Sequence, residues 1–490
     1  MPSDDELIRR LHACRETLEA IVEDRALLDR LEAPARRALV VAAGRVSRPE
    51  RAELRAAAKA RRRALERDER ARDEAVLART GIRRLRVELT FPTPPALPGE
   101  ATEAPAGEVG EPRKCYVCKA PYATIHHFYD QLCPPCAALS YERRLRTADL
   151  SGRVAVVTGA RVKIGYHAAI KLLRAGAAVV VTTRFPHDAA RRYAAEADFE
   201  GWRDRLSIYG LDLRHTPSVE RVAAHLAATL PRLDYVLNNA CQTVRRPAGF
   251  YQHLLDHETP DELGAPARAL LEGHRALRAS ALARRGEAAL ADSVALSQVA
   301  LLEEDVGRDL RLFPEGRLDA DGQQVDLRSL NSWRLTLDQV PMVELLEVQL
   351  VNAVAPFVLN ARLREPMRRT AARDKHIVNV SAMEGQFYRE FKTDKHPHTN
   401  MAKAALNMMT RTSAADYLRD GIHMNSVDTG WVTDEDPHEL AVKKVDVHGF
   451  HPPLDVVDGA ARIVDPIIDG VLTGTHVWGQ FLKDYRPVPW

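Results

Sequence analysis

Four cysteines in two closely spaced pairs are the strongest chemical signal in the chain. They follow the spacing C-x2-C-x14-C-x2-C and are Cys115, Cys118, Cys133 and Cys136. Each CxxC pair can offer two thiolates to one tetrahedral Zn²⁺ ion. We therefore predict a structural zinc site with four protein ligands, which leaves no coordination position for a substrate. His126 and His127 lie between the pairs, but four thiolates already complete the site.

A second signal is a glycine-containing turn between a short apolar run and an amphipathic segment. The run Arg153 to Thr158 predicts a buried parallel strand, and residues 158–165 read TGARVKIG. Tyr166 to Arg174 carries apolar residues at helical spacing, and Ala178 to Thr183 predicts a second buried strand. Such a βαβ unit places a helix N-terminus, with its free N–H groups, where a pyrophosphate can bind.

This turn resembles the T-G-x-x-x-G-x-G motif of the short-chain dehydrogenase/reductase superfamily. Thr158, Gly159 and Gly165 match the motif, whereas Lys163 stands where the middle glycine is expected. A glycine at that position lets the backbone approach the phosphates without a Cβ atom. The lysine is therefore a departure from the family pattern.

Further matches follow in the family's order along the chain. Asp212-Leu213 follows a predicted strand at Leu206 to Leu211, at the adenine-contacting position. Asn238 to Cys241 reads NNAC and resembles the family's N-N-A-G, and Val351 to Pro356 contains N-x-x-x-P. The resemblance covers roughly residues 150–490. It implies an α/β fold with a Rossmann-type doubly wound parallel sheet, preceded by an α-helical region and the small zinc module.

The resemblance also implies a nicotinamide dinucleotide cofactor. Family members that prefer NAD(H) usually carry an acidic residue where the second strand ends, and this chain has Arg184 there, with Arg161 in the turn. Both arginines can pair with a 2′-phosphate, so we expect NADP(H) to be preferred over NAD(H). The expected cofactor-binding residues are Thr158, Gly159, Arg161, Ile164, Gly165, Arg184, Asp212, Leu213, Asn239, Ala240, Lys403, Gly430, Val432 and Thr433.

The family's catalytic tetrad is only half present. Asn352 and Lys403 take the positions of the tetrad asparagine and lysine. Ala382 stands in place of the catalytic serine, and Thr399 stands in place of the tyrosine of Y-x-x-x-K. A threonine hydroxyl is too weak an acid to do the work of that tyrosine near neutral pH. The resemblance therefore implies an atypical active site.

Another side chain must supply the proton if the protein is an enzyme. Tyr388, in the segment after the strand predicted at His376 to Ser381, is our first candidate for the missing phenol, and His398 is the second. Glu384 and His396 lie in the same region. The predicted catalytic residues are Asn352, Lys403, Tyr388 and His398.

Composition excludes several classes of function. The chain has 490 residues, a net charge of +2, 45% hydrophobic residues and 28% charged residues. This nearly balanced charge provides no global field for nucleic acid or membranes. No apolar run approaches the ~20 residues of a membrane helix, and the N-terminus lacks the apolar segment of a secretory signal. We expect a cytoplasmic protein, a homo-oligomer, that acts on a small-molecule substrate.

The order of segments predicts four regions. Residues 1–90 predict an α-helical hairpin or coiled coil, and residues 91–113 predict a Pro-rich linker that forms neither helix nor strand. Residues 114–147 form the zinc module, and residues 148–490 form the Rossmann domain. The arginine clusters of the first region raise the alternative of nucleic-acid binding, but the acidic residues among them oppose it.

An insertion at about residues 245–335 separates two of the family's landmarks. We expect helices at Ala265 to Asp309, a hairpin at Arg311 to Arg328, and either a cover for the substrate or an oligomer interface. Two functions remain open. One is an NADP(H)-dependent oxidoreductase acting on a carbonyl, alcohol or activated double bond. The other is an inactive nucleotide-binding scaffold or sensor that recruits a protein partner through its zinc and helical modules.

Overall fold

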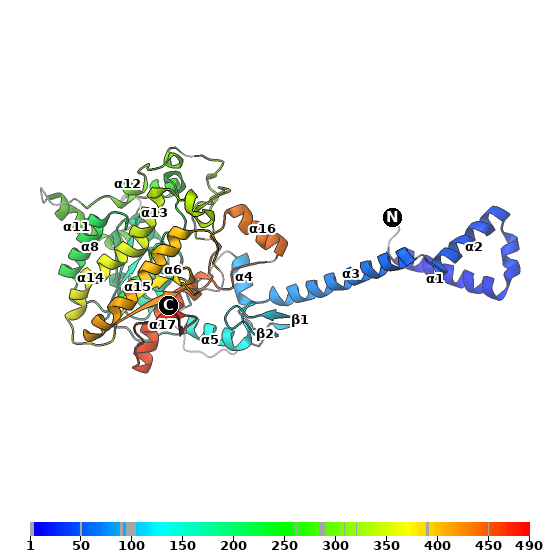
Figure 1. The fold of residues 1–490 in the computed structure, drawn as a ribbon, viewed down its shortest axis with the longest axis horizontal. Coiled ribbons are helices and arrows are strands. Elements are labelled where there is room, and N and C mark those ends of the chain that lie inside the picture. The colour runs from blue at the N-terminus through cyan, green and yellow to red at the C-terminus, as the bar shows by residue number, and fades with distance from the viewer. Residues whose placement is uncertain are drawn as a thin grey trace. The chain divides into compact units, whose positions relative to one another are not determined.

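The computed structural model describes residues 4–49, 51–88, 92–94, 104–259, 263–283, 290–307, 309–319, 321–388, 392–448 and 450–490. The chain divides into two compact units, residues 1–74 and residues 75–490 (Figure 1). The boundary between the units falls within the long helix α3 (Arg51–Leu77).

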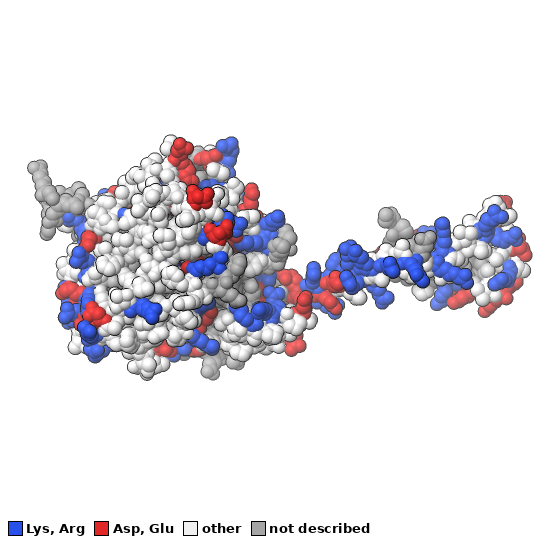
Figure 2. Space-filling model, in the orientation of Figure 1, with Lys and Arg blue, Asp and Glu red and all other residues white. Residues whose placement is uncertain are grey.

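The first unit is helical, as its sequence predicts. It contains α1 (Asp4–Glu23), a 3₁₀ turn at Arg25–Arg30, α2 (Ala33–Ser47) and most of α3. None of the residues of α1 and α2 is buried, and apolar side chains such as Leu11 are exposed to solvent. Basic and acidic side chains are mixed along these helices (Figure 2), so the unit shows no face of a single charge sign in that view.

The second unit is built on an eight-stranded sheet in the order β10-β9-β8-β7-β6-β3-β4-β5. All neighbouring strands are parallel except the β9–β10 pair. The strands are β3 (Val154–Thr158), β4 (Ala178–Thr183), β5 (Leu206–Gly210), β6 (Tyr235–Asn238), β7 (Lys375–Ser381), β8 (Ile422–Asp428), β9 (Phe481–Lys483) and β10 (Arg486–Val488). The strand order reverses between β3 and β6, and this topological switch point confirms the predicted doubly wound fold.

Helices cover both faces of this sheet (Figure 1). One hydrophobic core lies between the sheet and α6, α7 and α17, and a second lies between the sheet and α8, α14 and α15. The helices of this unit are α4 (Gly81–Val87), α5 (Pro134–Leu145), α6 (Lys163–Arg174), α7 (Pro186–Ala194), α8 (Thr216–Thr229), α9 (Gln252–Leu255), α10 (Ala265–Ala269), α11 (Glu272–Ala283), α12 (Ser293–Ser297), α13 (Met342–Gln349), α14 (Ala355–Arg368), α15 (Pro397–Arg419), α16 (His438–His448) and α17 (Val456–Thr473).

The predicted strands agree with the observed ones to within one or two residues, except at the C-terminal end. The run Thr475 to Leu482 predicts one strand, but only Phe481–Lys483 pairs with β8, and Arg486–Val488 then turns back as β10. The strand ladder begins only at Phe481 because the Asn425 side chain binds backbone groups of the preceding residues: it accepts from Gln480 N–H at 3.1 Å and donates to Val477 O at 2.8 Å.

Part of the predicted linker is a strand, which corrects the sequence prediction. β1 (Gly107–Lys114) pairs antiparallel with β2 (Pro121–Ile125), although Pro112 lies inside it. The pairing register shifts between Glu108 and Arg113, and proline is tolerated at such an irregularity because its missing N–H is not needed there. Most of the remaining linker lies outside the described residues.

The insertion is helical over only part of the predicted range, and its hairpin is reduced to one bridge. Helices α10, α11 and α12 and a 3₁₀ turn at Glu303–Asp305 lie within the described part of Ala265 to Asp309, but residues 298–302 form no helix. In the predicted hairpin, a single bridge joins Leu318 to Gln324 around the Asp321-Gly322 turn, and Gly322 has φ +66°. The turn chemistry is therefore present without the strands that it was expected to connect.

One helical segment, residues 342–368, is long and apolar enough to cross a membrane by length and composition. It runs through α13, a π-helical turn at Leu350–Val354 and α14. Its buried side includes Glu347 and Asn352, and α14 packs against the sheet in the second core. Its apolar character therefore matches that of a core helix.

Candidate functional site

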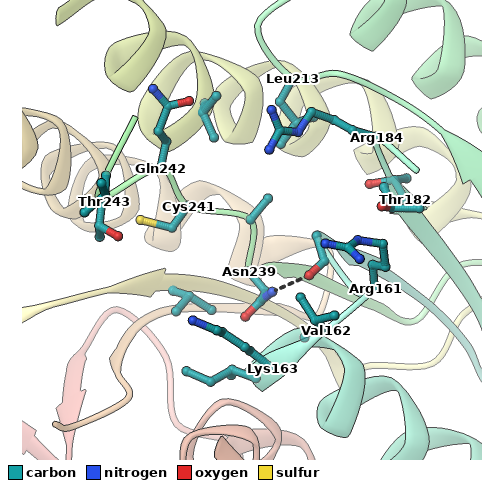
Figure 3. A pocket seen from close by; sticks show the side chains of 18 of the residues that line it. Arg161, Val162, Lys163, Thr182, Arg184, Leu213, Asn239, Cys241, Gln242 and Thr243 are labelled. Atoms are coloured by element: carbon teal, nitrogen blue, oxygen red, sulfur yellow. Dashed lines mark hydrogen bonds between the residues drawn. The ribbon is translucent and has the colours of Figure 1, made fainter. Parts of the chain in front are cut away.

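A cavity of about 460 Å³ opens at the carboxyl ends of β3, β4, β6 and β7, where the strand order reverses (Figure 3). Most of the residues predicted to bind the cofactor line it. Figure 3 shows Arg184 and Arg161 near one end and Gln242 and Thr243 near the other. Ligands of doubly wound sheets bind in this crevice, so the cavity is the candidate functional site.

The glycine turn and the end of β6 are held together by hydrogen bonds. Asn239 Nδ2 donates to Thr158 O at 3.0 Å and to Gly159 O at 3.2 Å, and Ala240 N–H donates to Thr158 Oγ1 at 3.0 Å. Gly159 has φ +65°, and a Cβ atom at Gly165 would lie 2.3 Å from Asn239 Nδ2. These two positions accept only glycine without rearrangement, which explains the matched part of the motif.

Lys163 occupies a backbone conformation that favours glycine. Its φ is +57°, in the left-handed region, and its side chain lines the cavity in view in Figure 3. A left-handed non-glycine residue costs roughly 1–2 kcal/mol. The lysine therefore keeps the turn geometry of the family and adds an ammonium group to the cavity. Lys163 also acts on Asp321 of the insertion: burial raises the pKa of Asp321, and Lys163 opposes that rise.

Arg184 borders the cavity directly after β4. Its guanidinium donates to Tyr251 OH at 2.6 Å and lies over the Tyr251 ring, 4.5 Å from the ring centre. No carboxylate among the described residues forms an ion pair with it. Arg184 is thus a positioned cation whose charge is available to an anionic ligand.

Arg161 is positioned differently from the sequence expectation. It is buried, its guanidinium forms an ion pair with Asp188 at 2.7 Å, and it donates to Gln323 Oε1 of the insertion. Burial would raise the pKa of Asp188, but Arg161 and Arg192 outweigh that effect and lower it. The charge of Arg161 is therefore already balanced by protein, although the residue lines the cavity.

Asp212 and Leu213 also line the cavity, next to Arg184. The Asp212 carboxylate accepts from the Arg214 guanidinium at 2.7 Å, and Arg214 also pairs with Glu347 at 2.8 Å. Burial raises the pKa of Asp212, while Arg214 and Arg184 lower it by more. The ionised Asp212 carboxylate, held by Arg214, thus forms part of the cavity wall at the expected adenine-contacting position.

The opposite part of the cavity contains Lys403, Ser381 and Ala382. Lys403 Nζ donates to Val380 O at 2.8 Å, so its ammonium group is held beside the end of β7. Ser381 Oγ is buried and has no hydrogen-bond partner among the described residues. The sequence comparison assigned the serine position to Ala382, but the neighbouring Ser381 brings a hydroxyl to this wall.

Asn352 lies in the π-helical turn between α13 and α14 and is buried. Its Oδ1 accepts from Gln242 N–H at 2.8 Å, and its Nδ2 donates to Gln242 O at 3.0 Å. This two-point contact fixes the backbone of Gln242, a cavity-lining residue. Asn352 therefore positions the wall of the cavity.

The loop after β8 contributes Thr433 and Glu435 to the lining. Thr433 Oγ1 donates to Glu435 Oε1 at 2.7 Å, and Thr243 Oγ1 approaches Glu435 Oε2 at 3.4 Å. Gly430 and Val432 belong to the same loop, and Gly430 has φ +76°. Glu435 is a carboxylate in the cavity that the sequence motifs did not identify. It lies two residues beyond Thr433, the residue that the family resemblance points to in this loop.

The two predicted proton donors do not line the cavity. The Tyr388 side chain is 91% exposed. His398 is buried, with its Nε2 3.4 Å from Glu344 Oε1, and Thr399 is also buried, with no partner for its hydroxyl among the described residues. Of the predicted catalytic residues, Lys403 lines the cavity and Asn352 lies behind its wall in contact with Gln242, whereas Tyr388 and His398 do not line it.

Away from the cavity, the four cysteines converge as their spacing predicts. Their sulfur atoms all lie within 4.8 Å of one another, and Cys118 Sγ is 3.5 Å from Cys133 Sγ. Ligands at about 2.3 Å from a tetrahedral zinc ion are separated by roughly 3.8 Å, so the cluster fits that ion. Cys133 N–H donates to Cys115 Sγ, and the backbone N–H of Ala120 lowers the pKa of Cys118 to about 7.

The cysteine module shares a hydrophobic core with the Rossmann domain. Val432, Leu454 and Val457 pack in one cluster with module residues that include both buried cysteines. Tyr116, directly after the first cysteine, accepts the backbone N–H of Trp431 at 2.9 Å. Arg144 is buried against Asp455 and Asp458 at the start of α17, at 2.7 and 2.9 Å. The module therefore supports the loop that carries Thr433.

The insertion borders the cavity and the same loop. Tyr251 and Arg246 line the cavity, Gln323 contacts Arg161, and Asn331 Nδ2 donates to Glu435 O at 2.9 Å. These contacts favour the cavity-covering role over the alternative of an oligomer interface.

Two family models match the chain. The model described as short chain dehydrogenase matches residues 153–258, and the model described as Enoyl-(Acyl carrier protein) reductase matches residues 336–445. The segment between the two matches corresponds to most of the insertion.

Similar solved structures include a short-chain dehydrogenase from Streptomyces avermitilis, with 17% identity and a TM-score of 0.41 over 68% of this chain and 88% of that chain. They also include the Pseudomonas aeruginosa RhlG/NADP complex, with 18% identity and a TM-score of 0.42 over 68% of this chain and 95% of that chain.

Sequence relatives extend further along the chain. An uncharacterized protein of Acanthamoeba polyphaga mimivirus is 30% identical over 387 residues, which are 76% of this chain and 74% of that protein. Dehydrogenase/reductase SDR family member 13 of Bos taurus is 37% identical over 120 residues, 23% of this chain and 29% of that protein. Together with the two family models and the doubly wound fold, these matches show that the chain belongs to the short-chain dehydrogenase/reductase superfamily of oxidoreductases.

Proposed function

We propose that the protein is a cytoplasmic, NADP(H)-dependent oxidoreductase with an atypical active site, acting on a carbonyl, alcohol or activated double bond of a small molecule. One observation carries this proposal: a single cavity connects the glycine turn and Arg184 to Lys403. Its volume of about 460 Å³ lies within the usual range for cofactor and small-molecule sites. When bound, the nicotinamide carries the hydride, and the chain must hold the phosphates and exchange a proton at the substrate oxygen.

Arg184 supports NADP(H) as the preferred cofactor. It lies where the ribose-binding residue follows the second strand of a doubly wound sheet. Tyr251 orients its guanidinium by a hydrogen bond and a ring contact, without neutralising its charge. A 2′-phosphate would gain a charge-assisted hydrogen bond from this cation. Arg161 contributes less, because Asp188 already balances it.

We expect Arg184→Ala to weaken NADPH binding by roughly 10- to 150-fold, since a hydrogen bond to a charged group contributes about 1.5–3 kcal/mol. NADH binding should change little, because NADH lacks the 2′-phosphate. Calorimetric titration of both cofactors measures the difference. Arg203→Ala is the matched control, because Arg203 is a half-exposed arginine that pairs with Glu200 away from the cavity lining. Equal losses for the two cofactors would contradict the assignment.

Lys163 supports phosphate binding in a way that the family motif does not. The turn keeps the left-handed geometry, so the helix N-terminus of α6 remains directed at the expected pyrophosphate position. The lysine side chain adds a mobile cation to that position. Its ammonium group and the N–H groups of the turn act on the same anion.

Two substitutions at this position separate the charge from the backbone conformation. Lys163→Gly and Lys163→Ala both remove the ammonium group and should weaken NADPH binding to a similar extent, by roughly tenfold or more. Lys163→Gly should unfold at a higher temperature than Lys163→Ala, because alanine retains a left-handed cost of roughly 1–2 kcal/mol. Thermal unfolding and calorimetry measure the two effects. Unchanged NADPH affinity in both variants would exclude Lys163 as a phosphate ligand.

Glu435 is the carboxylate best placed to exchange a proton with the substrate oxygen. It lines the cavity, and Thr433 and Thr243 hold its two oxygens. Tyr251, the tyrosine among the described lining residues, contacts Arg184 at the other end. Reduction of a carbonyl adds the hydride to carbon and one proton to oxygen, and oxidation of the alcohol reverses both transfers. The Glu435 carboxyl group can donate the proton in one direction and accept it in the other.

Glu435→Gln preserves the shape of this side chain and removes its acid–base function. We expect it to slow the chemical step by ~10²–10⁴-fold in single-turnover reactions with NADPH and a panel of carbonyl compounds. Tyr388→Phe, His398→Ala and Thr399→Ala should leave that step much less affected, because these side chains do not line the cavity. A large loss in Tyr388→Phe with none in Glu435→Gln would instead restore the tyrosine predicted from the sequence.

A different outcome of the same experiment would favour the scaffold function. In that outcome, the parent protein binds NADPH tightly and yet consumes none with any compound of the panel. Ala382 and Thr399 in place of the catalytic serine and tyrosine then reflect loss of catalysis. The protein would then act as a nucleotide-binding scaffold or sensor, and its helical first unit would be the surface for a protein partner.

We propose Zn²⁺ as the ion of the four-cysteine cluster. The sulfur separations fit a closed tetrahedral site, and that site is structural because all four positions are filled by protein. Because residues 114–147 precede the predicted Rossmann domain, which has a hydrophobic interior of its own, the sequence predicts that loss of the module spares cofactor binding. The shared core with Val432 and Val457 suggests instead that metal loss disturbs the cavity loop.

Cys133→Ser should lower the zinc content of purified protein by about one equivalent and lower the thermal midpoint of the second unit. We also expect weaker NADPH binding, because the loop carrying Thr433 loses its support. Elemental analysis, thermal unfolding and calorimetry check the three effects. Cys14→Ser is the matched control, because Cys14 is exposed on α1 and isolated from the cluster. Zinc loss with unchanged NADPH affinity would show that the module is independent after all.

A further inference from the structure

Three histidines lie close together at the amino-terminal ends of β7 and β8, the end of the sheet opposite the cavity. His376 is the second residue of β7, His423 is the second residue of β8, and the two are paired in register. His476 follows α17, in the segment that leads to β9. Ser381, at the cavity end of β7, is five residues from His376, or roughly 16 Å along an extended strand. The cluster is therefore distinct from the candidate cofactor site.

The side-chain nitrogens of the three histidines are close enough to share one ion. One ligand nitrogen from each lies within 4.8 Å of the other two, and His376 Nε2 is 3.0 Å from His476 Nδ1. Two nitrogens bound to one tetrahedral Zn²⁺ at 2.0–2.1 Å are roughly 3.3 Å apart. The His376–His476 pair thus requires only a small adjustment to bind the same ion.

The backbone fixes the orientation and tautomer of His423. Its Nδ1 is 3.1 Å from Lys375 O, and a carbonyl oxygen can only accept a hydrogen bond. The proton is therefore on Nδ1, and Nε2 carries the free lone pair. Metal-binding histidines commonly donate their second N–H to a backbone carbonyl in this way.

A helical glycine lets the histidine rings pack closely against α17. A Cβ atom at Gly470 of α17 would lie 2.3 Å from His476 Nδ1 and 3.1 Å from His376 Nε2. Gly470 has an ordinary helical backbone, so its conformation does not require glycine, and glycine inside a helix costs roughly 0.5–1 kcal/mol relative to alanine. The glycine is therefore explained by the close approach of the His476 and His376 rings to α17, because a larger side chain would overlap them.

The electrostatic surroundings keep the imidazoles neutral. Burial and the two neighbouring histidines hold the pKa of His376 well below its usual value, and burial also lowers the pKa of His423 and His476. Asp374 opposes that shift in His476, and Arg153 reinforces it. His376 Nδ1 is buried and has no partner among the described residues. Neutral imidazoles retain the lone pairs that a metal ion needs.

We propose that His376, His423 and His476 bind one Zn²⁺ ion, with a water molecule as the fourth ligand on the partly exposed side of His476. Imidazole ligands without carboxylates favour zinc and its late transition-metal neighbours over Mg²⁺ or Ca²⁺. The ion joins β7, β8 and the segment before β9, three elements that are far apart in sequence. It is separate from the ion of the four-cysteine cluster.

The zinc content of the full-length protein, prepared without a histidine tag or chelator, tests this proposal. His476→Ala is the informative variant because its side chain is partly exposed and its removal disturbs the core least. We expect it to contain about one equivalent of zinc less than the parent, with unchanged NADPH binding. His12→Ala, on the exposed helix α1, is the matched control and should retain the parent's zinc content.

Thermal unfolding with added Zn²⁺ tests the site even if the ion is lost during purification. After dialysis of each protein in the same metal-free buffer, added Zn²⁺ should raise the thermal midpoint of the parent and of His12→Ala by more than that of His476→Ala. A dependence of zinc content or of this zinc-induced shift on His476 supports the site. If both quantities are the same in the parent and in His476→Ala, the proposal is wrong, and the histidines form only a hydrogen-bonded pair.

Discussion

The close approach of β3 and β6 at the topological switch point is the constraint on which the cavity depends. Asn239 holds it by donating to the backbone carbonyls of Thr158 and Gly159, and Gly165 leaves room for that amide. With the turn fixed this way, the start of α6 lines the cavity, and the connections after β3 and β6 lead to helices on opposite faces of the sheet. An anion can then be bound by backbone groups whose positions are set by the sheet, before any side chain contributes.

Buried ion pairs extend this framework to the insertion. Arg245 is buried and pairs with Asp305 of the insertion at 2.7 Å and with Glu347 of α13 at 3.2 Å. Glu347 also pairs with Arg214, which holds Asp212 in the cavity wall. Such pairs contribute little net stability, but removal of one partner leaves an uncompensated charge. They therefore specify where the insertion packs, and they place it along the cavity.

The sequence predicted the elements whose signals are local. β4 was predicted to the residue because a run of β-branched residues between Gly176 and Arg184 has one favourable structure in a buried sheet. β1 was missed because its pairing with β2 overrides the proline signal at Pro112. In the site, the glycine turn and Lys403 were found through the resemblance to the family's motifs, whereas Glu435 and the ion pair of Arg161 with Asp188 depend on long-range packing. Tyr388 was chosen by its residue type and its position after β7, and the conformation of that segment places it in solvent.

The cysteine module is linked to the cavity through packing, so a metal ion bound by its four cysteines would act on the cavity without chemistry at the metal. A closed four-thiolate site cannot bind a substrate, but Tyr116, directly after Cys115, holds the backbone N–H of Trp431. Trp431 lies two residues before Thr433, and Val432 between them is part of the core shared with the module. The loop is therefore anchored at two adjacent residues, Trp431 and Val432, by the element that contains the four cysteines. The cysteine module thus supports the candidate site without contributing a residue to its lining.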